Sequence, residues 1–141
     1  MKKSVLDIVP YDQITKIHHL EFGNFYFLDN IIIAEVFEGV VYDWSKGRLV
    51  FALAAQHFGR SPVHYISNRI NDYSIRPQDW RSFYEHKQYL ESYCIVTYTS
   101  SGYTNLLFEQ LFYSSQIYHF HDLENALTFV KQYDKQLREN L

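Results

Sequence analysis

Short apolar runs rich in β-branched and aromatic residues alternate with segments of helical periodicity along most of the chain. The apolar runs lie at residues 24–28, 31–37, 63–67, 92–98 and 116–120. Each of the last four is followed by a segment in which apolar residues recur every three or four positions. This alternation is typical of an α/β fold in which helices pack on a largely parallel sheet.

The first two runs form a predicted β-hairpin. Asp29 and Asn30 separate them, and both residue types tolerate the positive φ angles of a two-residue hairpin turn. Residues 31–37 are apolar on both faces, which indicates a central strand. We therefore expect an α/β domain with a mixed five-stranded sheet, made of a β-hairpin and then four β-α units, flanked by helices.

Capping residues predict where the helices begin and end. Asp43 and Asp122 can accept the free backbone N–H groups of a first helical turn, and Gly59 follows the last apolar position of the helix after Asp43. Pro77 suits the first turn of a third helix. Residues 1–22 are the least patterned, and we expect them to form a loose N-terminal arm, or a short helix around residues 11–19, before a domain at 23–141.

Composition excludes several functional classes. Thirteen basic and sixteen acidic residues give a net charge of −3, which argues against broad binding of nucleic acid or anionic lipid. No apolar run approaches the roughly 20 residues of a membrane span. Cys94 is the single cysteine and lies within an apolar run, which excludes a disulfide framework and predicts a reducing, cytoplasmic location.

No catalytic motif, cofactor motif or metal-ligand spacing occurs in the sequence, so we predict no catalytic residues, no cofactor and no metal. His119 and His121 alternate along a predicted strand, but a structural zinc site needs about four ligands and a catalytic site about three. Cys94 is interpreted as a small core residue rather than a nucleophile.

A polar loop follows the third predicted strand, where ligands of open α/β sheets bind. Its candidate interaction or anion-binding residues are Asn68, Arg69, Asn71, Asp72, Ser74 and Arg76. The alternative interpretation is that Asn and Asp shape a turn and cap the next helix. The Ser100-Ser101-Gly102 segment is a second loop of this kind, and a simple helix cap is the favoured role for it.

Aromatic residues concentrate around the helix predicted at residues 103–112. We expect Leu106, Leu107 and Leu111 to face the core, which leaves an aromatic second side. The candidate aromatic interface is formed by Tyr103, Phe108 and Phe112. A thick aromatic core and a protein interface, including a homodimer contact, explain this cluster equally well.

The order of elements resembles the SpoIIAA-like, or STAS-like, domains, which are bacterial anti-sigma-factor antagonists and their relatives. The local stretches FGNFY at 22–26, YISNR at 65–69, YSIRPQDW at 73–80 and LLFEQLF at 106–112 look like a group of SpoIIAA-like proteins from Bacteroidetes-type bacteria, whose activity is not established. The antagonists carry a phosphorylated serine after the third strand, within an Asp-Ser motif followed by glycine. Here Tyr73 separates Asp72 from Ser74, and no glycine follows.

The resemblance implies a non-enzymatic regulatory or protein-interaction module that lacks the usual phosphoacceptor motif, with Ser74 as a candidate phosphorylation site. The alternative is a small domain that binds an apolar ligand or lipid between aromatic walls. An enzyme is the least supported class, because the acidic residues show no spacing that would identify a catalytic pair.

Overall fold

Six strands form one mixed sheet in the computed structural model, which describes residues 2–85, 90–112 and 116–140, with the side chains of Pro77, Trp80, Tyr84 and Phe112 excepted. The strands are β1 Lys16–Leu20, β2 Gly23–Leu28, β3 Ile31–Val36, β5 Val63–Arg69, β7 Leu90–Thr97 and β8 Ile117–Phe120. The helices are α1 Val5–Ile8, α2 Trp44–Phe58, α3 Trp80–Glu85, α4 Ser100–Phe112 and α5 Leu123–Glu139. Two single-turn 3₁₀ helices lie at Tyr11–Gln13 and Pro77–Asp79, and the short strands β4 Val41–Tyr42 and β6 Ser74–Ile75 pair separately.

The sheet has the order β1-β2-β3-β5-β7-β8. Strands β1, β2 and β3 are antiparallel neighbours, whereas β3, β5, β7 and β8 run parallel. The predicted hairpin is confirmed as β2 and β3, with Asp29 at a φ of 45° in the turn. All six residues of β3 are buried, as expected for a central strand. The α/β class with a mixed sheet is therefore confirmed.

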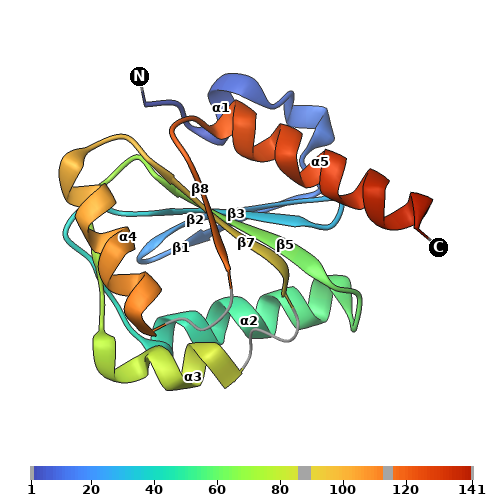
Figure 1. Ribbon diagram of the computed structural model, residues 1–141. Coiled ribbons are helices and arrows are strands. Elements are labelled where there is room, and N and C mark those ends of the chain that lie inside the picture. Colours follow the sequence, from blue (N-terminus) through green and yellow to red (C-terminus); the bar gives the residue numbers. More distant parts are fainter. Residues whose placement is uncertain (1, 86–89, 113–115, 141) are drawn as a thin grey trace.

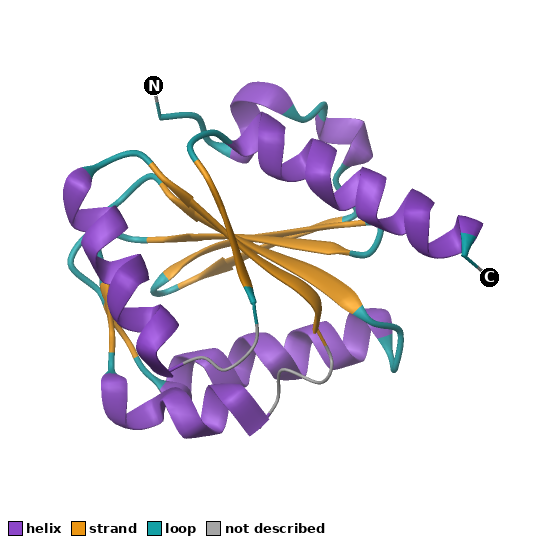
Figure 2. Cartoon of the chain, viewed as in Figure 1, coloured by secondary structure: helices purple, strands orange, loops and turns teal. Residues whose placement is uncertain are grey.

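Helices cover both faces of the sheet (Figures 1 and 2). The connections from β3 through α2, β5, α3, β7 and α4 to β8 all step across the sheet in one direction. Right-handed crossovers that step the same way place their helices on one face, so α2, α3 and α4 share a face. Helix α5 follows the last strand and lies with α1 on the opposite face (Figure 1).

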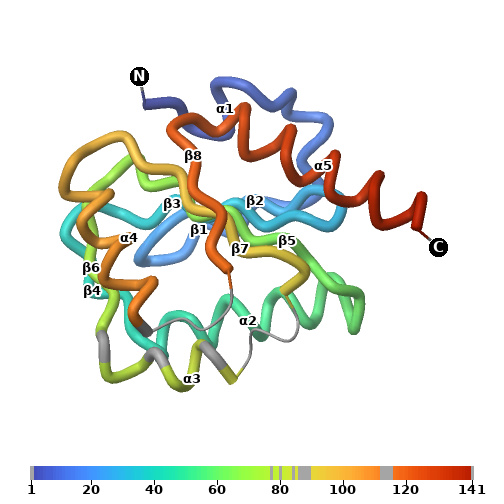
Figure 3. Tube along the Cα trace, in the orientation of Figure 1, coloured from blue at the N-terminus to red at the C-terminus, as the bar shows by residue number. Residues whose placement is uncertain are grey.

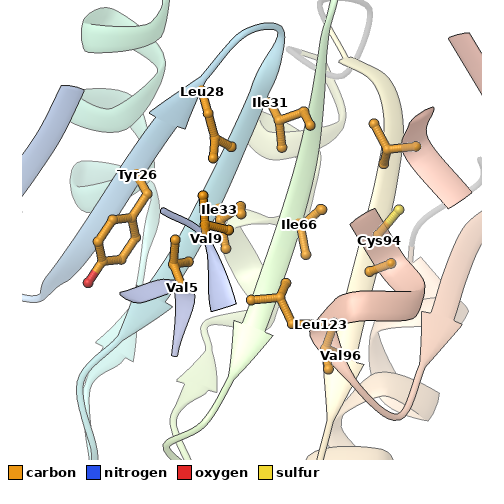
Figure 4. Packing of buried hydrophobic residues seen from close by; sticks show 12 residues of the cluster. Val5, Val9, Tyr26, Leu28, Ile31, Ile33, Ile66, Cys94, Val96 and Leu123 are labelled. Atoms are coloured by element: carbon orange, nitrogen blue, oxygen red, sulfur yellow. The ribbon is translucent and has the colours of Figure 1, made fainter. Parts of the chain in front are cut away.

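The face under α1 and α5 is densely packed (Figure 4). Leu123, Ala126 and Val130 of α5 are fully buried against Ile33, Ile66 and Val96 of the sheet. Val5 of α1 is also fully buried. The Glu35 carboxylate accepts hydrogen bonds from the Val5 backbone N–H at 2.9 Å and from the Ser4 hydroxyl at 2.7 Å. These contacts fix the N-terminal segment on the sheet.

The predicted helix caps are confirmed at two positions. The Asp43 carboxylate accepts the Lys46 N–H at 3.1 Å at the start of α2, and Asp122 accepts the Asn125 N–H at 2.7 Å at the start of α5. Gly59 ends α2 with a φ of 65°. Thr99, rather than the following serines, caps α4, since its hydroxyl accepts the Gly102 N–H at 3.0 Å.

The predicted strand count is wrong by one, because β1 adds an edge strand. We expected a loose arm or a short helix around residues 11–19, yet Lys16–Leu20 pairs with β2 in the register Ile17 to Tyr26. Residues 16–20 have the sequence KIHHL, in which polar and apolar residues do not alternate regularly, so the sequence carries little strand signal. Pairing with the exposed edge of β2 imposes the extended conformation instead.

Candidate ligand-binding cavity

A cavity of about 780 Å³ lies between helices α2 and α3 and the sheet. Its apolar lining includes Val50 and Phe51 of α2, Phe83 of α3, and Val63 and Leu90 at the start of their strands. Figure 1 shows α2 and α3 side by side beneath the sheet, on the face opposite α1 and α5. The cavity therefore lies on the face of the sheet opposite α1 and α5.

Small side chains on α2 explain why this space is open. Ala54 lines the cavity and is buried, so a larger side chain there would extend into the gap between helix and sheet. A Cβ atom at Gly47 would lie within van der Waals overlap of the Phe83 ring, which shows how closely α3 approaches α2 at this end. Protein interiors are otherwise close-packed, so a space of this size is a specific feature of the fold.

Hydroxyl groups form one wall of the mainly apolar cavity. Tyr65 and Ser67 project from β5, Tyr93 from β7, Tyr42 from β4, and Tyr73 from the segment before β6. Alternate residues of a strand point to the same face, which places Tyr65 and Ser67 together on the α2 side. Figure 3 shows β4 and β6, which carry or flank two of these tyrosines, side by side at one end of the sheet.

The hydroxyl wall is internally hydrogen-bonded. The hydroxyls of Ser67 and Tyr73 are 2.9 Å apart, and Arg69 Nε donates to Ser67 Oγ at 3.1 Å. The Tyr42 ring stacks on the Phe83 ring with centroids 5.7 Å apart and an interplanar angle of 20°. Contacts with β5 and α3 thus hold the rings of Tyr73 and Tyr42 in place.

Burial keeps these phenols neutral. It raises the pKa of each of the four tyrosines above the ordinary value, and neighbouring phenols or the Glu109 carboxylate add to the rise. A neutral phenol both donates and accepts a hydrogen bond. The wall therefore presents polar groups without a net charge.

A buried ion pair supports the wall from behind. Arg69 Nη2 donates to both carboxylate oxygens of Glu109 in α4, at 2.6 and 2.7 Å, and both residues are buried. Burial acts to lower the pKa of Arg69, but the Glu109 carboxylate outweighs it and the pKa is raised, so the guanidinium stays charged. The guanidinium carbon also lies 5.3 Å from the centroid of the Tyr73 ring.

The structure separates the polar residues predicted to form one loop site. Arg69 faces the cavity side, whereas Asn68 faces α1 and donates to Glu35 at 2.8 Å. Asn71 donates to the Val36 carbonyl, and Asp72 accepts from the Thr99 hydroxyl at 3.2 Å. Ser74 and Arg76 are exposed, and the Arg76 N–H donates to the Tyr42 carbonyl. Most of these residues stabilise the segment that carries Tyr73.

The aromatic side of α4 is exposed to solvent where it is described. Tyr103 is 45% exposed and Phe108 60%, and the side chain of Phe112 lies outside the described part of the chain. Leu106 is buried against Ile95 and Ile117, as predicted. The predictions for Leu107 and Leu111 are wrong, because both are exposed. Glu109, which the sequence analysis did not place on the inward side of this helix, is buried.

Sequence reasoning also missed a buried Ser-His-Asp chain beneath α5. His64 Nδ1 lies 2.6 Å from Ser92 Oγ, and His64 Nε2 lies 2.7 Å from Asp134 Oδ1. A nucleophilic serine must reach substrate, but Ser92 and His64 are buried in the strands and the cavity lies on the other face. These hydrogen bonds connect α5 to the sheet.

Among the described residues, no group of three or more His, Cys, Asp or Glu side chains is placed to hold a metal ion. The rings of His119 and His121 have centroids 4.7 Å apart, and His119 Nε2 is hydrogen-bonded to the Thr97 hydroxyl at 2.6 Å. None of the described helices is both long enough and apolar enough to span a bilayer.

No family model, curated protein or solved structure matches the chain. The resemblance to SpoIIAA-like domains therefore stays a prediction.

The sequence of α2 carries one signal for the cavity, which is its group of small residues. The stretch from Gly47 to Ala55 combines glycine and three alanines with large residues on the same helix. The phenols that complete the wall come from four separate segments, which no local pattern connects.

Proposed function

We propose that this domain binds a small, largely apolar molecule in the cavity between α2, α3 and the sheet. The observation that carries the proposal is the cavity itself, whose volume of about 780 Å³ compares with roughly 300–1,000 Å³ for typical ligand sites. Its lining is mainly apolar and aromatic with a few converging polar groups, which is the usual composition of such sites. The proposed activity is binding without catalysis.

Native mass spectrometry of the freshly purified protein tests this proposal. A co-purifying small molecule, released on denaturation, is the expected result. The Ala54→Phe variant places a large ring at a buried position of the cavity lining and should lose that molecule while still folding. Gln56→Phe adds the same ring to an exposed neighbour on α2 outside the lining and serves as the control. Equal ligand content in both variants would argue against binding in this cavity.

The second candidate function is a regulatory, protein-interacting module of the SpoIIAA-like type. The observation that favours it is the exposed apolar side of α4, where Leu107, Phe108 and Leu111 face solvent. A two-fold contact needs only one self-complementary patch, so a second copy of this chain is the occupant we propose. Regulation through phosphorylation of the exposed Ser74 belongs to the same proposal.

Sedimentation velocity over a range of concentrations tests the homodimer. A dimer is expected for the wild-type chain and a monomer for Leu111→Glu, which places a charge on the apolar side of α4. Gln110→Glu adds the same charge at an exposed neighbouring position and should remain dimeric. A wild-type mass of one chain at the highest concentration would reject the homodimer.

We also propose that the protein works in the cytoplasm without binding nucleic acid. The single thiol of Cys94 is buried and unpaired by a disulfide, and the net charge of −3 opposes polyanion binding.

A further inference from the structure

We propose that the cavity ligand is an uncharged apolar molecule that carries a hydrogen-bond-accepting oxygen, such as a ketone, ester or amide carbonyl, and that this oxygen sits against the hydroxyl wall of Tyr65, Ser67 and Tyr73. This inference rests on the proposed binding function and specifies the chemistry of the ligand. It follows from the number of hydroxyl protons in the wall and from the charges beside it.

The Ser67 and Tyr73 pair has one proton more than it uses. The pair carries two hydroxyl protons and makes one hydrogen bond between its oxygens, at 2.9 Å. Within the part of the chain that the structure describes, the remaining polar contact of the Ser67 side chain is with Arg69 Nε, which is itself a donor. Whichever hydroxyl donates within the pair, one O–H remains to donate toward the cavity that both residues line.

Tyr65 adds a second hydroxyl to the wall. It projects from β5 on the same side as Ser67 and lines the cavity. Burial raises the pKa of this phenol, so it stays neutral and can donate a hydrogen bond to a ligand. The Ser67 and Tyr73 pair and the Tyr65 hydroxyl therefore favour a ligand group that accepts hydrogen bonds.

The charges beside the wall favour an uncharged acceptor. Arg69 is the cation nearest to Ser67 and Tyr73 among the described contacts, and its charge is already balanced by the contact of Nη2 with both carboxylate oxygens of Glu109. A ligand carboxylate buried against this wall would find no unpaired cation there among the described residues, and an unpaired buried charge is costly. Arg48 and Arg60 also line the cavity, but both side chains are exposed and lie where it meets solvent.

Three probes of nearly equal shape test the inference: 2-acetonaphthone, 2-ethylnaphthalene and 2-naphthoate. Isothermal titration calorimetry at pH 7 compares their dissociation constants. The ketone carries a neutral acceptor, the hydrocarbon carries no acceptor, and the carboxylate carries a charged acceptor. We expect the ketone to bind about 3- to 10-fold more tightly than the hydrocarbon, the range of one or two net hydrogen bonds. The carboxylate should bind more weakly than the ketone.

Tyrosine-to-phenylalanine variants connect this preference to the wall. Tyr73→Phe and Tyr65→Phe each keep the ring and remove one hydroxyl, so each should weaken ketone binding about 3-fold and leave hydrocarbon binding unchanged. Tyr11→Phe removes a hydroxyl from an exposed residue outside the cavity lining and is the matched control. Circular dichroism melting of each variant establishes that it is folded before titration.

The possible outcomes separate this inference from the proposed function. Equal binding of all three probes, or ketone binding that is insensitive to both variants, would overturn the acceptor inference and leave apolar ligand binding intact. Tightest binding of 2-naphthoate, weakened by Arg48→Gln or Arg60→Gln, would replace it with recognition of an anion at the cavity mouth. If no probe binds and no molecule co-purifies, the binding function itself fails.

Discussion

Burial suppresses the reactivity of the Cys94 thiol. It lies on the densely packed face of the sheet with Ile66 and Val96 (Figure 4), and burial raises the pKa of its thiol to about 12. Because the thiolate is the reactive form, we expect no reaction with Ellman's reagent at pH 8 in the folded protein. Unfolding in urea should expose one thiol that reacts fully. Rapid reaction of the native protein would contradict this packing.

Asp134 makes stability depend on pH. Burial acts to raise the pKa of its carboxyl, but hydrogen bonds from Asn30 and His64, with the charge of Arg138, outweigh this and lower the pKa. A carboxyl with a lowered pKa stabilises the fold above its unfolded value of about 3.9, and the contribution is lost as the pH falls through the folded value.

Urea unfolding between pH 7 and pH 3 measures this contribution. Asp134→Asn should lower the free energy of unfolding by about 1 kcal/mol at pH 7, and the difference from wild type should shrink below about pH 4. Asp12→Asn, which removes a charge from an exposed position, is the control. A difference that stays constant down to pH 3 would show that the Asp134 charge is not responsible.

Individual residues were predictable where the cause is local. The caps at Asp43 and Asp122, the turn at Asp29 and the burial of Cys94 each depend on the residue type and its nearest neighbours in sequence. Arg69 was placed in a candidate anion-binding loop, yet it pairs with Glu109, 40 residues later. A partner at that separation is set by how α4 packs on the sheet, and no spacing rule expresses it.

The Arg69 and Glu109 pair attaches α4 to the sheet and can be tested as an element contact. Removing one partner of a buried pair leaves the other charge uncompensated, so Arg69→Met and Glu109→Met should each lower the free energy of unfolding by about 3 kcal/mol or more. The Arg69→Met, Glu109→Met double variant should recover much of that loss, because two apolar side chains can replace a buried pair at little cost.

Urea denaturation of the two single variants and the double variant provides the cycle. The exposed pair of Arg81 and Glu85 within α3 is the matched control, and its removal should change stability little. Additive losses in the double Arg69 and Glu109 variant would mean that the two side chains are not coupled across α4 and β5.

Elements differed in how far their own sequence specified them. Strand β3 and helix α5 carry strong patterns and appear as predicted, whereas β1 exists because β2 offers a free edge. The inward side of α4 was misassigned at Leu107 and Leu111, because the buried side of this helix carries Gly102, Leu106 and the ion-paired Glu109 instead. Polar contacts between distant elements thus override the hydrophobic pattern.

At the scale of the whole molecule, the two faces of the sheet are covered differently: α1 and α5 pack on one face, and α2 and α3 enclose a cavity on the other. The alternation of strands and helices was enough to predict an α/β domain with a mixed sheet, since few topologies accommodate that order. It could not predict that α1 and α5 close one face densely while α2 and α3 leave a cavity on the other. Packing density depends on side chains from many segments at once, so it became visible only in the assembled fold.

Methyl ¹H–¹³C NMR during titration with 2-ethylnaphthalene tests the central claim most directly, because methyl groups lie on both faces of the sheet. Binding in the cavity should shift the signals of Val50, Ala55 and Val63. The signals of Ala126 and Val130, on the α5 face, should stay in place. Absence of any shift at saturation, or shifts confined to the α5 face or to Leu107 and Leu111 of α4, would contradict the account.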